Sequence, residues 1–367
     1  MATLSTIRAF VGSDELENGA NESLPLFPSV PCHRDTQRQV PPPPEPAADR
    51  VGIARLAASS PLADTKRGAE YFILPARSIL NRCDSERVPF TWTVNPYRGC
   101  EFGCKYCYAR YTHEYMELDG GEFERKIFVK EDAGPLAARD LRSNAVRGEH
   151  IAIGTATDPY QPAERDFGAT RAILEEMAEL DGLSVSITTK SDQVLRDLDL
   201  LKRIHERSRL TVNLSVTTPR PGLARLLEPR APRPDLRIGA VRALRQAGLA
   251  AGILVMPVLP GLTDRASDLE VLARAARDAG ACWFAASVLF LMPASRKQFL
   301  PFLEEKFPRL AARYREYYER SGYAPGSYRA EIAERFAGLR RKYGLDARRE
   351  LPERPSMHVT EQLTLAL

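Results

Sequence analysis

Residues 151–180 read IAIGTATDPYQPAERDFGATRAILEEMAEL, and they carry the clearest fold signal in the chain. Residues 151–157 form a short apolar run of strand length that ends at polar residues and a proline. Residues 169–180 then place apolar side chains at helical spacing. The stretch therefore predicts a buried strand followed by a helix, which is the repeating unit of parallel sheets.

The same order of a short apolar run and a helical stretch occurs six times. Strands are predicted at 88–94, 151–157, 184–190, 210–217, 252–259 and 282–290. Helices are predicted near 108–118, at 169–180, 194–207, 237–248 and 267–280, and from 296 onward. Strict alternation implies parallel strands joined by right-handed crossovers, so the predicted class is α/β. An open doubly wound sheet and a full or partial barrel both fit, and either has its active face at the carboxyl ends of the strands.

The 367 residues allow one large domain with tails or two domains. Lysine and arginine number 52 and aspartate and glutamate 48, so the net charge of +4 excludes a protein held to nucleic acid by bulk charge. We expect a disordered proline-rich arm over 1–50, a lead-in segment over 51–87, a core domain over 88–300 and a helical extension over 301–367.

Nothing in the sequence predicts contact with a membrane. The longest apolar runs, such as 247–258, are too short and too interrupted to span a bilayer. The N-terminal residues carry Asp14 and Glu15 and lack an apolar region, so no signal peptide is expected. We therefore expect a cytoplasmic protein with reduced thiols, in which clustered cysteines indicate metal binding or catalysis.

The segment NPYRGCEFGCKYCYAR, residues 95–110, contains Cys100, Cys104 and Cys107 in the spacing C-x3-C-x2-C. Thiolates select zinc or iron–sulfur clusters, and a structural zinc site needs four ligands. His113 is the nearest candidate for a fourth ligand, although we expect it on a surface helix. Three ligands indicate a cluster or a metal that keeps one open position.

The cysteine spacing, with Tyr106 just before the last cysteine, resembles that of the radical S-adenosylmethionine (SAM) superfamily. The segments NPYRGC, CKYCYAR, TDPYQPAE, TTKS and VMPVLPGLTD are similar to a bacterial subgroup related to spore photoproduct lyase and described as DNA repair photolyases. The resemblance covers about residues 88–300. It implies a partial parallel (β/α)6 barrel, an incomplete TIM-type barrel.

The resemblance also implies a reaction. Cys100, Cys104 and Cys107 would hold three irons of a [4Fe–4S] cluster, and SAM would chelate the fourth. An electron from an external reductase of flavodoxin or ferredoxin type would cleave SAM to a 5′-deoxyadenosyl radical, which abstracts hydrogen from an unknown substrate. A nucleic-acid base and a protein side chain are both candidates. The alternative is a non-catalytic iron–sulfur or zinc protein that binds nucleic acid or a protein partner.

The same resemblance implies a pocket for SAM at the carboxyl ends of the strands. Thr155, Thr157 and Asp158 would lie in the segment that binds the amino group, unless they form only a turn or cap. Lys190 would meet the methionine carboxylate, and Ser215 would approach the ribose or the carboxylate. The main chain near Tyr106 would meet the adenine.

Two features depart from this picture. Spore photoproduct lyase uses a cysteine in its second-strand region to return a hydrogen atom to its product, but IGTATDPY contains none. The repair reaction is therefore not implied. The chain after residue 300 is helical, basic and rich in tyrosine, which favours helices that close the barrel over a surface that binds nucleic acid. Arg196 and Asp197 are expected to pair on a helix face or to brace a neighbouring loop.

Overall fold

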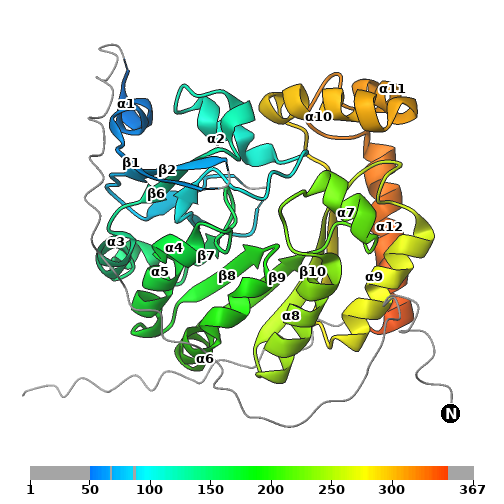
Figure 1. Ribbon diagram of the computed structural model, residues 1–367. Coiled ribbons are helices and arrows are strands. Elements are labelled where there is room, and N and C mark those ends of the chain that lie inside the picture. Colours follow the sequence, from blue (N-terminus) through cyan, green and yellow to red (C-terminus); the bar gives the residue numbers. More distant parts are fainter. Residues whose placement is uncertain (1–49, 67, 86–87, 346–367) are drawn as a thin grey trace, which may run out of the picture. The chain divides into compact units, whose positions relative to one another are not determined.

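The computed structural model describes residues 50–66, 68–85 and 88–345 (Figure 1). The disordered arm predicted over 1–50 therefore lies outside the described residues, apart from its last position. The final 22 residues of the predicted helical extension, 346–367, lie outside them as well.

A seven-stranded sheet, in the order β11-β10-β9-β8-β7-β4-β3, forms the centre of the fold. Its strands are β3 (Leu80–Arg82), β4 (Trp92–Val94), β7 (His150–Ile153), β8 (Ser184–Thr189), β9 (Arg209–Ser215), β10 (Ala250–Val258) and β11 (Phe284–Val288). From β4 to β11 every neighbouring pair is parallel, and only β3 is antiparallel. A doubly wound sheet reverses its strand order, but here the order follows the chain. The predicted α/β class and partial parallel barrel are confirmed.

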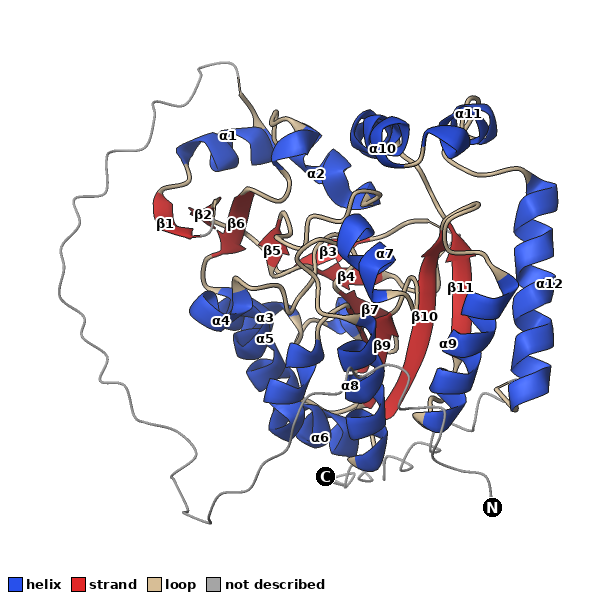
Figure 2. Ribbon diagram, turned by 45° about the vertical axis from the view of Figure 1, so that its right-hand side comes forward, coloured by secondary structure: helices blue, strands red, loops and turns tan. Residues whose placement is uncertain are grey.

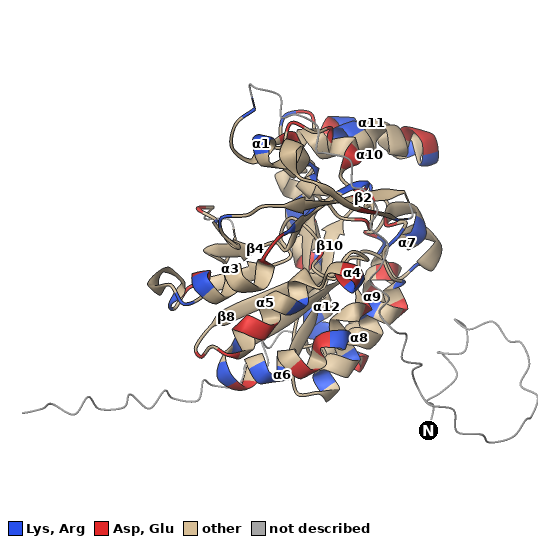
Figure 3. Ribbon diagram, turned by 60° about the vertical axis from the view of Figure 1, so that its left-hand side comes forward, with Lys and Arg blue, Asp and Glu red and all other residues tan. Residues whose placement is uncertain are grey.

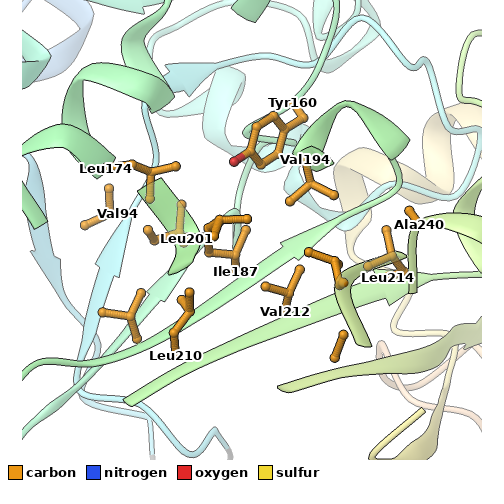
Figure 4. Close-up of a cluster of buried hydrophobic side chains, with 14 of the residues drawn as sticks. Val94, Tyr160, Leu174, Ile187, Val194, Leu201, Leu210, Val212, Leu214 and Ala240 are labelled. Atoms are coloured by element: carbon orange, nitrogen blue, oxygen red, sulfur yellow. The ribbon is translucent and has the colours of Figure 1, made fainter. Parts of the chain in front are cut away.

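Helices cover the outer face of this sheet. They include α5 (Ala169–Ala178), α6 (Leu198–Arg207), α8 (Pro234–Gln246) and α9 (Ala266–Asp278), which follow β7, β8, β9 and β10. Figure 4 shows part of the core between them, where Ile187 and Val212 of the strands lie among helix residues such as Leu201. All three are fully buried. The apolar runs seen in the sequence thus correspond to strands covered by helices.

The opposite, concave face of the sheet is polar because side chains alternate along each strand. The two ring nitrogens of His150 lie 2.9 Å from the hydroxyls of Ser184 and Ser186. Trp283 donates its indole N–H to the Asn213 side chain at 3.0 Å. Its ring lies so close to Gly252 that a Cβ there would come within 2.4 Å. Polar side chains of β7, β8 and β9 therefore line part of this face.

Several predicted elements are shorter in the structure: the strand predicted over 88–94 is only Trp92–Val94, and the one predicted over 282–290 is Phe284–Val288. The strand predicted over 151–157 ends at Ile153, because Gly154 adopts a φ of +87° and leaves the ladder. The helix predicted near 108–118 is a 3-10 helix, Tyr108–Arg110, followed by one short helix, α2 (Tyr111–Glu114). It stops there because the N–H groups of the next residues turn back to the His113 carbonyl.

A second sheet, in the order β1-β2-β6-β5, corrects the sequence analysis, which assigned a lead-in segment over 51–87 and predicted no strands near 97–98 or 126–130. Its strands are β1 (Leu62–Lys66), β2 (Ala69–Leu74), β5 (Tyr97–Arg98) and β6 (Lys126–Lys130). β2 pairs with β6 in parallel, and β5 pairs with β6 in antiparallel fashion. Helix α1 (Gly52–Ser59) packs against this sheet through Ala57, beside Leu74 and Phe128. The sheet ends at β5, directly before the cysteines.

Shorter helices occupy several connections. They are α3 (Ala133–Asp140), α4 (Glu164–Phe167) and α7 (Pro221–Leu227).

The described C-terminal part consists of α10 (Pro293–Lys306), α11 (Pro308–Tyr317) and α12 (Gly326–Tyr343). Phe299 of α10 contacts Tyr106 edge to face, with ring centroids 6.4 Å apart. Figure 3 shows acidic and basic positions together on α10 and α11, so neither helix is uniformly basic. In the described part of the chain, no helix combines the length and apolar composition needed to cross a bilayer.

Candidate functional site

The cysteine loop, residues 100–107, lies between β5 and the 3-10 helix. Its backbone is fixed to the segment that leads into β6, because the N–H of Cys100 donates to the Phe123 carbonyl at 3.0 Å. Gly99 has a φ of +85°, and a Cβ there would lie 2.6 Å from the carbonyl oxygen of Lys126. Only glycine allows so close an approach in this conformation.

Two buried side chains from the loop after β7 brace the cysteine loop. The Thr157 hydroxyl donates to the Gly99 carbonyl at 2.6 Å. The Gln161 amide donates to the same carbonyl at 3.1 Å, and its oxygen accepts from the N–H of Glu101 at 2.9 Å. The Gln161 amide also donates to the Thr157 hydroxyl at 2.9 Å. Sequence reasoning missed Gln161, whose only signal is its place two residues after the proline of TDPYQ.

The three thiols are enclosed. Cys100 and Cys104 are buried and Cys107 is half-buried. Burial raises the pKa of Cys100 and Cys107, and it raises that of Cys104 to about 12 although Lys190 opposes the change. Metal binding requires thiolates, so loading the site releases protons.

The number of cysteine ligands indicates which metal or cluster the loop could hold. Among the residues that the structure describes, no three His, Cys, Asp or Glu side chains form a group suited to a single metal ion. Zinc requires four ligands around one point, whereas the cysteines of a cluster bind different irons. Three cysteines leave one position without a protein ligand, a donor set that suits a cluster with an open corner rather than a closed structural zinc site.

Asp158 links the loop after β7 to the end of β8. One of its carboxylate oxygens accepts from the Thr189 hydroxyl at 2.6 Å and from the N–H of Tyr160 at 3.0 Å. The other accepts from the N–H of Lys190 at 2.7 Å. Thr155 is half-buried, and its hydroxyl accepts from the Asn95 amide at 3.0 Å. The hydroxyls of Thr155 and Thr157 and the Asp158 carboxylate thus all have partners within the protein, and their role toward SAM stays a prediction.

Lys190 follows β8 directly, and its ammonium lies 5.8 Å from the centroid of the Tyr106 ring. Within the described residues this ammonium makes no hydrogen bond or ion pair. Burial lowers the pKa of Lys190, but nearby Cys104 and Glu228 more than offset that effect and the net shift is upward. A charged, unpaired ammonium next to the cysteine loop is suited to an anionic ligand.

Ser215 is the last residue of β9 and is buried. Its carbonyl oxygen accepts from the Arg237 guanidinium at 3.0 Å. Its hydroxyl has no hydrogen-bond partner in the described part of the chain. Ser215 ends β9, and Lys190 directly follows β8. Because β8 and β9 are parallel neighbours, both residues lie at the carboxyl ends of adjacent strands.

Behind Tyr106 lies a buried polar cluster that the sequence did not reveal. The Tyr106 hydroxyl donates to Glu228 and lies 3.0 Å from the Thr217 hydroxyl, which also donates to Glu228, at 2.7 Å. Arg237 pairs with the other oxygen of Glu228 at 2.6 Å. Burial raises the pKa of Glu228, but Arg237 and Lys190 outweigh it and lower the value to about 2. The cluster holds the Tyr106 side chain, and with it the cysteine loop, against the end of β9.

His113 corrects an expectation, because it is fully buried rather than placed on a surface helix. One ring nitrogen lies 3.0 Å from the Lys126 carbonyl oxygen, and the ring packs edge to face against Phe123 and Phe128. Burial lowers the pKa of His113 to about 4. The nitrogen that bonds to Lys126 is not free to act as a fourth ligand beside the cysteines.

Arg196 and Asp197 act as a brace, one of the two roles predicted for them. Arg196 pairs with Glu164 at 2.7 Å and with Asp197 at 3.0 Å, and Asp197 also pairs with Arg171 at 2.7 Å. The pairs join the turn after β8 to α4 and α5. The network reaches the cysteine loop through Glu164, whose N–H donates to the carbonyl of Gln161 at 3.0 Å.

Comparison with known proteins gives two kinds of match. The family model described as the Radical SAM superfamily matches residues 94–274. An uncharacterized protein of Mycobacterium tuberculosis is 36% identical over 324 residues, which are 87% of this chain and 94% of the relative. An uncharacterized protein of Methanocaldococcus jannaschii is 34% identical over 173 residues, 47% of this chain and 62% of the relative.

Solved structures agree in fold. A variant of spore photoproduct lyase with bound AdoMet and dinucleoside spore photoproduct superposes with a TM-score of 0.54 at 12% identity, over 84% of this chain and 85% of that one. A second variant gives a TM-score of 0.57 at 15% identity, over 84% and 86% of the two chains. With the matched family model, the full-length relative and the cysteine loop at the head of a parallel sheet, the chain belongs to the radical SAM superfamily and is an enzyme of that superfamily.

Proposed function

We propose that Cys100, Cys104 and Cys107 hold a [4Fe–4S] cluster whose remaining iron takes SAM. Membership of the superfamily implies the [4Fe–4S] cluster, SAM and an external electron donor. The observation that carries the assignment to these residues is the unpaired ammonium of Lys190 beside the cysteine loop. When bound, the reduced cluster supplies the electron that splits SAM and so provides a radical for hydrogen abstraction.

The residues around the loop supply the pocket for SAM. Lys190 meets the methionine carboxylate, and Ser215 offers its hydroxyl to the ribose or the same carboxylate. Asp158 still has lone pairs for the amino group, because one of its oxygens accepts only a single protein N–H. The polypeptide around Tyr106 contacts the adenine. Thr155 and Thr157 support this role indirectly, since their hydroxyls hold the strand-end loop and the cysteine loop in place.

An external reductase of flavodoxin or ferredoxin type delivers the electron, and the reducing cytoplasm suits the free thiols. One of the lyase structures contains dinucleoside spore photoproduct, whereas IGTATDPY lacks the cysteine that the lyase uses. Spore photoproduct is therefore not the substrate here unless another group replaces that cysteine. We therefore propose hydrogen abstraction from a different substrate, with a nucleic-acid base and a protein side chain as the two classes to test.

Anaerobic reconstitution with iron and sulfide tests the proposal. The protein should become brown, bind iron in place of zinc, and release 5′-deoxyadenosine from SAM when dithionite is added. Alanine at any of the three cysteines should abolish that product. A colourless zinc protein, or a cluster protein that leaves SAM intact, would contradict the proposal and favour a non-catalytic role.

Lys190→Met tests the pocket separately from the cluster. Loss of one charge-assisted bond to a carboxylate should weaken SAM binding by about tenfold or more, while the cluster still forms. Lys202→Met is a matched control, because Lys202 is exposed on α6 away from the loop. Equal SAM affinity in both variants would remove Lys190 from the pocket.

A further inference from the structure

Two cationic side chains lie on one face of the second sheet, next to the cysteine loop. Arg98 is on β5 opposite Phe128 of β6, and the N–H of Lys130 bonds to the Pro96 carbonyl at 3.1 Å. Cross-strand neighbours point to the same side and side chains alternate along a strand. Arg98, Phe128 and Lys130 therefore share a face, and Arg98 stands two positions before the first cysteine.

Neither cation has a carboxylate partner among the described residues. Lys130 is 5% exposed, and its ammonium makes a single contact, 3.4 Å from the Ile79 carbonyl oxygen. That distance is beyond the usual range of a hydrogen bond. Arg98 makes no hydrogen bond or ion pair within the described ranges, and its Nε is buried without an acceptor. Asp140 interacts with Lys130 only through its charge, without direct contact. Its carboxylate already accepts hydrogen bonds from the Ser78 hydroxyl and from the N–H of Ile79.

Two other buried cations among the described residues are compensated by carboxylates. Arg110 and Arg237 are each 1% exposed, and each has a carboxylate at 2.6 Å, from Glu124 and Glu228 respectively. By contrast, burial together with the charge of Arg98 lowers the pKa of Lys130 to about 7. Buried charges without partners cost free energy, so an uncompensated pair is typical of a site that a bound anion completes.

A row of tyrosines adjoins the two cations. The Arg98 guanidinium lies close enough to the Tyr111 phenol for the two groups to interact electrostatically. Tyr111 lies between Tyr108 and Tyr115, with ring centroids at 6.4 and 5.3 Å, and these outer rings are 40% and 68% exposed. The Tyr108 hydroxyl donates to the Thr155 carbonyl in the loop after β7. The tyrosine row, Tyr108–Tyr111–Tyr115, thus runs from the predicted SAM loop toward solvent beside the cations.

We propose that Arg98 and Lys130 form an anion site that takes a phosphate or carboxylate group of the substrate, while the tyrosine row contacts the remainder of that molecule. The inference rests on the proposed function, because it places the substrate of that enzyme. It is distinct from the SAM carboxylate site, which we assign to Lys190 at the end of β8 in the other sheet. Arg98 stands two residues before Cys100, so a substrate anchored by Arg98 lies next to the cysteine loop.

Calorimetric titration of the cluster-loaded protein, without reductant, tests the site with three separate probes: inorganic phosphate, succinate and SAM. Lys130→Met and Arg98→Gln should each weaken binding of phosphate or succinate by about tenfold or more, since each removes a charge-assisted bond. Both variants should bind SAM as the wild type does. Lys126→Met is the control, because Lys126 is on the same strand and face but pairs with Glu122 at 2.9 Å.

The outcomes separate this inference from the proposed function. Stronger binding of phosphate than of succinate supports a phosphate-bearing substrate, and the reverse supports a carboxylate. Failure of the wild type to bind either probe, or equal binding by the variants, overturns the anion site. Weaker SAM binding by Lys130→Met overturns it too, because the pair then belongs to the cofactor. Release of 5′-deoxyadenosine is measured in parallel, so loss of cofactor chemistry is recognised independently of anion binding.

Discussion

Glu228 accepts bonds from Tyr106 and Thr217 and pairs with Arg237, all in the interior beside the cysteine loop. A buried ion pair is costly to form, but removing one member leaves the other charge unpaired, which is costlier still. Glu228 therefore controls both the position of the Tyr106 side chain and the balance of charges next to Cys104. Its effect on stability can be separated from its effect on the loop.

Glu228→Gln should lower the free energy of unfolding by about 3–5 kcal/mol, because Arg237 then remains buried without a counter-charge. The double variant Glu228→Gln/Arg237→Met should be more stable than either single variant, since it removes both charges. Urea denaturation of the four proteins measures this cycle. Additive losses in the double variant would show that the two charges do not depend on each other.

At the residue scale, the sequence predicts side chains whose role depends on local spacing. The three cysteines form a compact motif, and Lys190 is conspicuous as a charged residue at the end of a buried strand. Gln161 and Glu228 carry no such signal, because their partners are distant in the chain: Gln161 bonds to Gly99, 62 positions away, and Glu228 to Tyr106, 122 positions away. Only the packed fold brings them together.

At the scale of elements, the cysteine loop is held between two sheets. Gly99 lets it pass close to the start of β6: the carbonyl oxygens of Lys126 in β6 and of Phe123 just before it lie 2.6 and 2.8 Å from the place of a Cβ. The Lys126 oxygen cannot move without disturbing the second sheet, because Lys126 is part of β6. The approach of the loop to β6 therefore depends on this one glycine.

Gly99→Ala should destabilise the fold and release iron, because the added methyl group meets backbone atoms and the φ of +85° is unfavourable for alanine. Gly239→Ala is the control: Gly239 lies inside α8 with nothing near its Cβ position, and alanine there should stabilise the protein by about 0.5–1 kcal/mol. Thermal melting and iron content after reconstitution measure both effects. Full iron loading of Gly99→Ala would contradict the requirement for glycine.

The packing of α2 against β6 predicts a pH dependence through His113. The folded protein lowers the pKa of His113 from 6.5 to about 4, so in that window the unfolded chain binds the proton more tightly. The contribution of neutral His113 to the free energy of unfolding is therefore fully present above pH 6.5. It is lost as the pH falls from 6.5 toward about 4. The loss should reach about 2–3 kcal/mol near pH ~4.5.

His113→Gln removes this titration while keeping a donor for the Lys126 carbonyl. The unfolding free energy of the variant, measured in urea at about pH 7.5 and about pH 4.5, should fall by about 2–3 kcal/mol less than that of the wild type. Equal losses in the two proteins would show that His113 does not titrate in this range.

Sequence patterns predicted the six parallel strands because each contains a short apolar run, and β7, β8, β9 and β10 are each followed by a helix that covers the sheet. The second sheet escaped prediction for two physical reasons. β5 has only two residues, which is too short for an alternating pattern. β2 and β6 pair across a long separation, Tyr71 with Ile127, and such pairings leave no local mark. The start of the 108–118 helix was predicted, but its early end depends on bonds to the His113 carbonyl.

For the molecule as a whole, a partial barrel leaves an edge strand to protect. β11 ends the large sheet and pairs with β10 only. Figure 2 shows α12 running beside β11 and α9. Phe336 of α12 is buried and stacks on Phe284 of β11, with ring centroids 5.0 Å apart. Covering the edge in this way prevents pairing with another chain.

Phe336→Ala should therefore lower the free energy of unfolding by about 3–5 kcal/mol, the usual range for truncating a buried aromatic side chain. The variant should also aggregate more readily, because a loosened α12 exposes β11. Glu334→Ala is the control, since Glu334 is exposed on the same helix and should change stability by less than about 0.5 kcal/mol. Urea denaturation and light scattering on warming measure the two effects.

The cysteine loop contacts α10 rather than α12, so the Phe336→Ala variant, while folded, should bind iron as the wild type does. Loss of iron at full secondary-structure content would instead show that α12 supports the site directly.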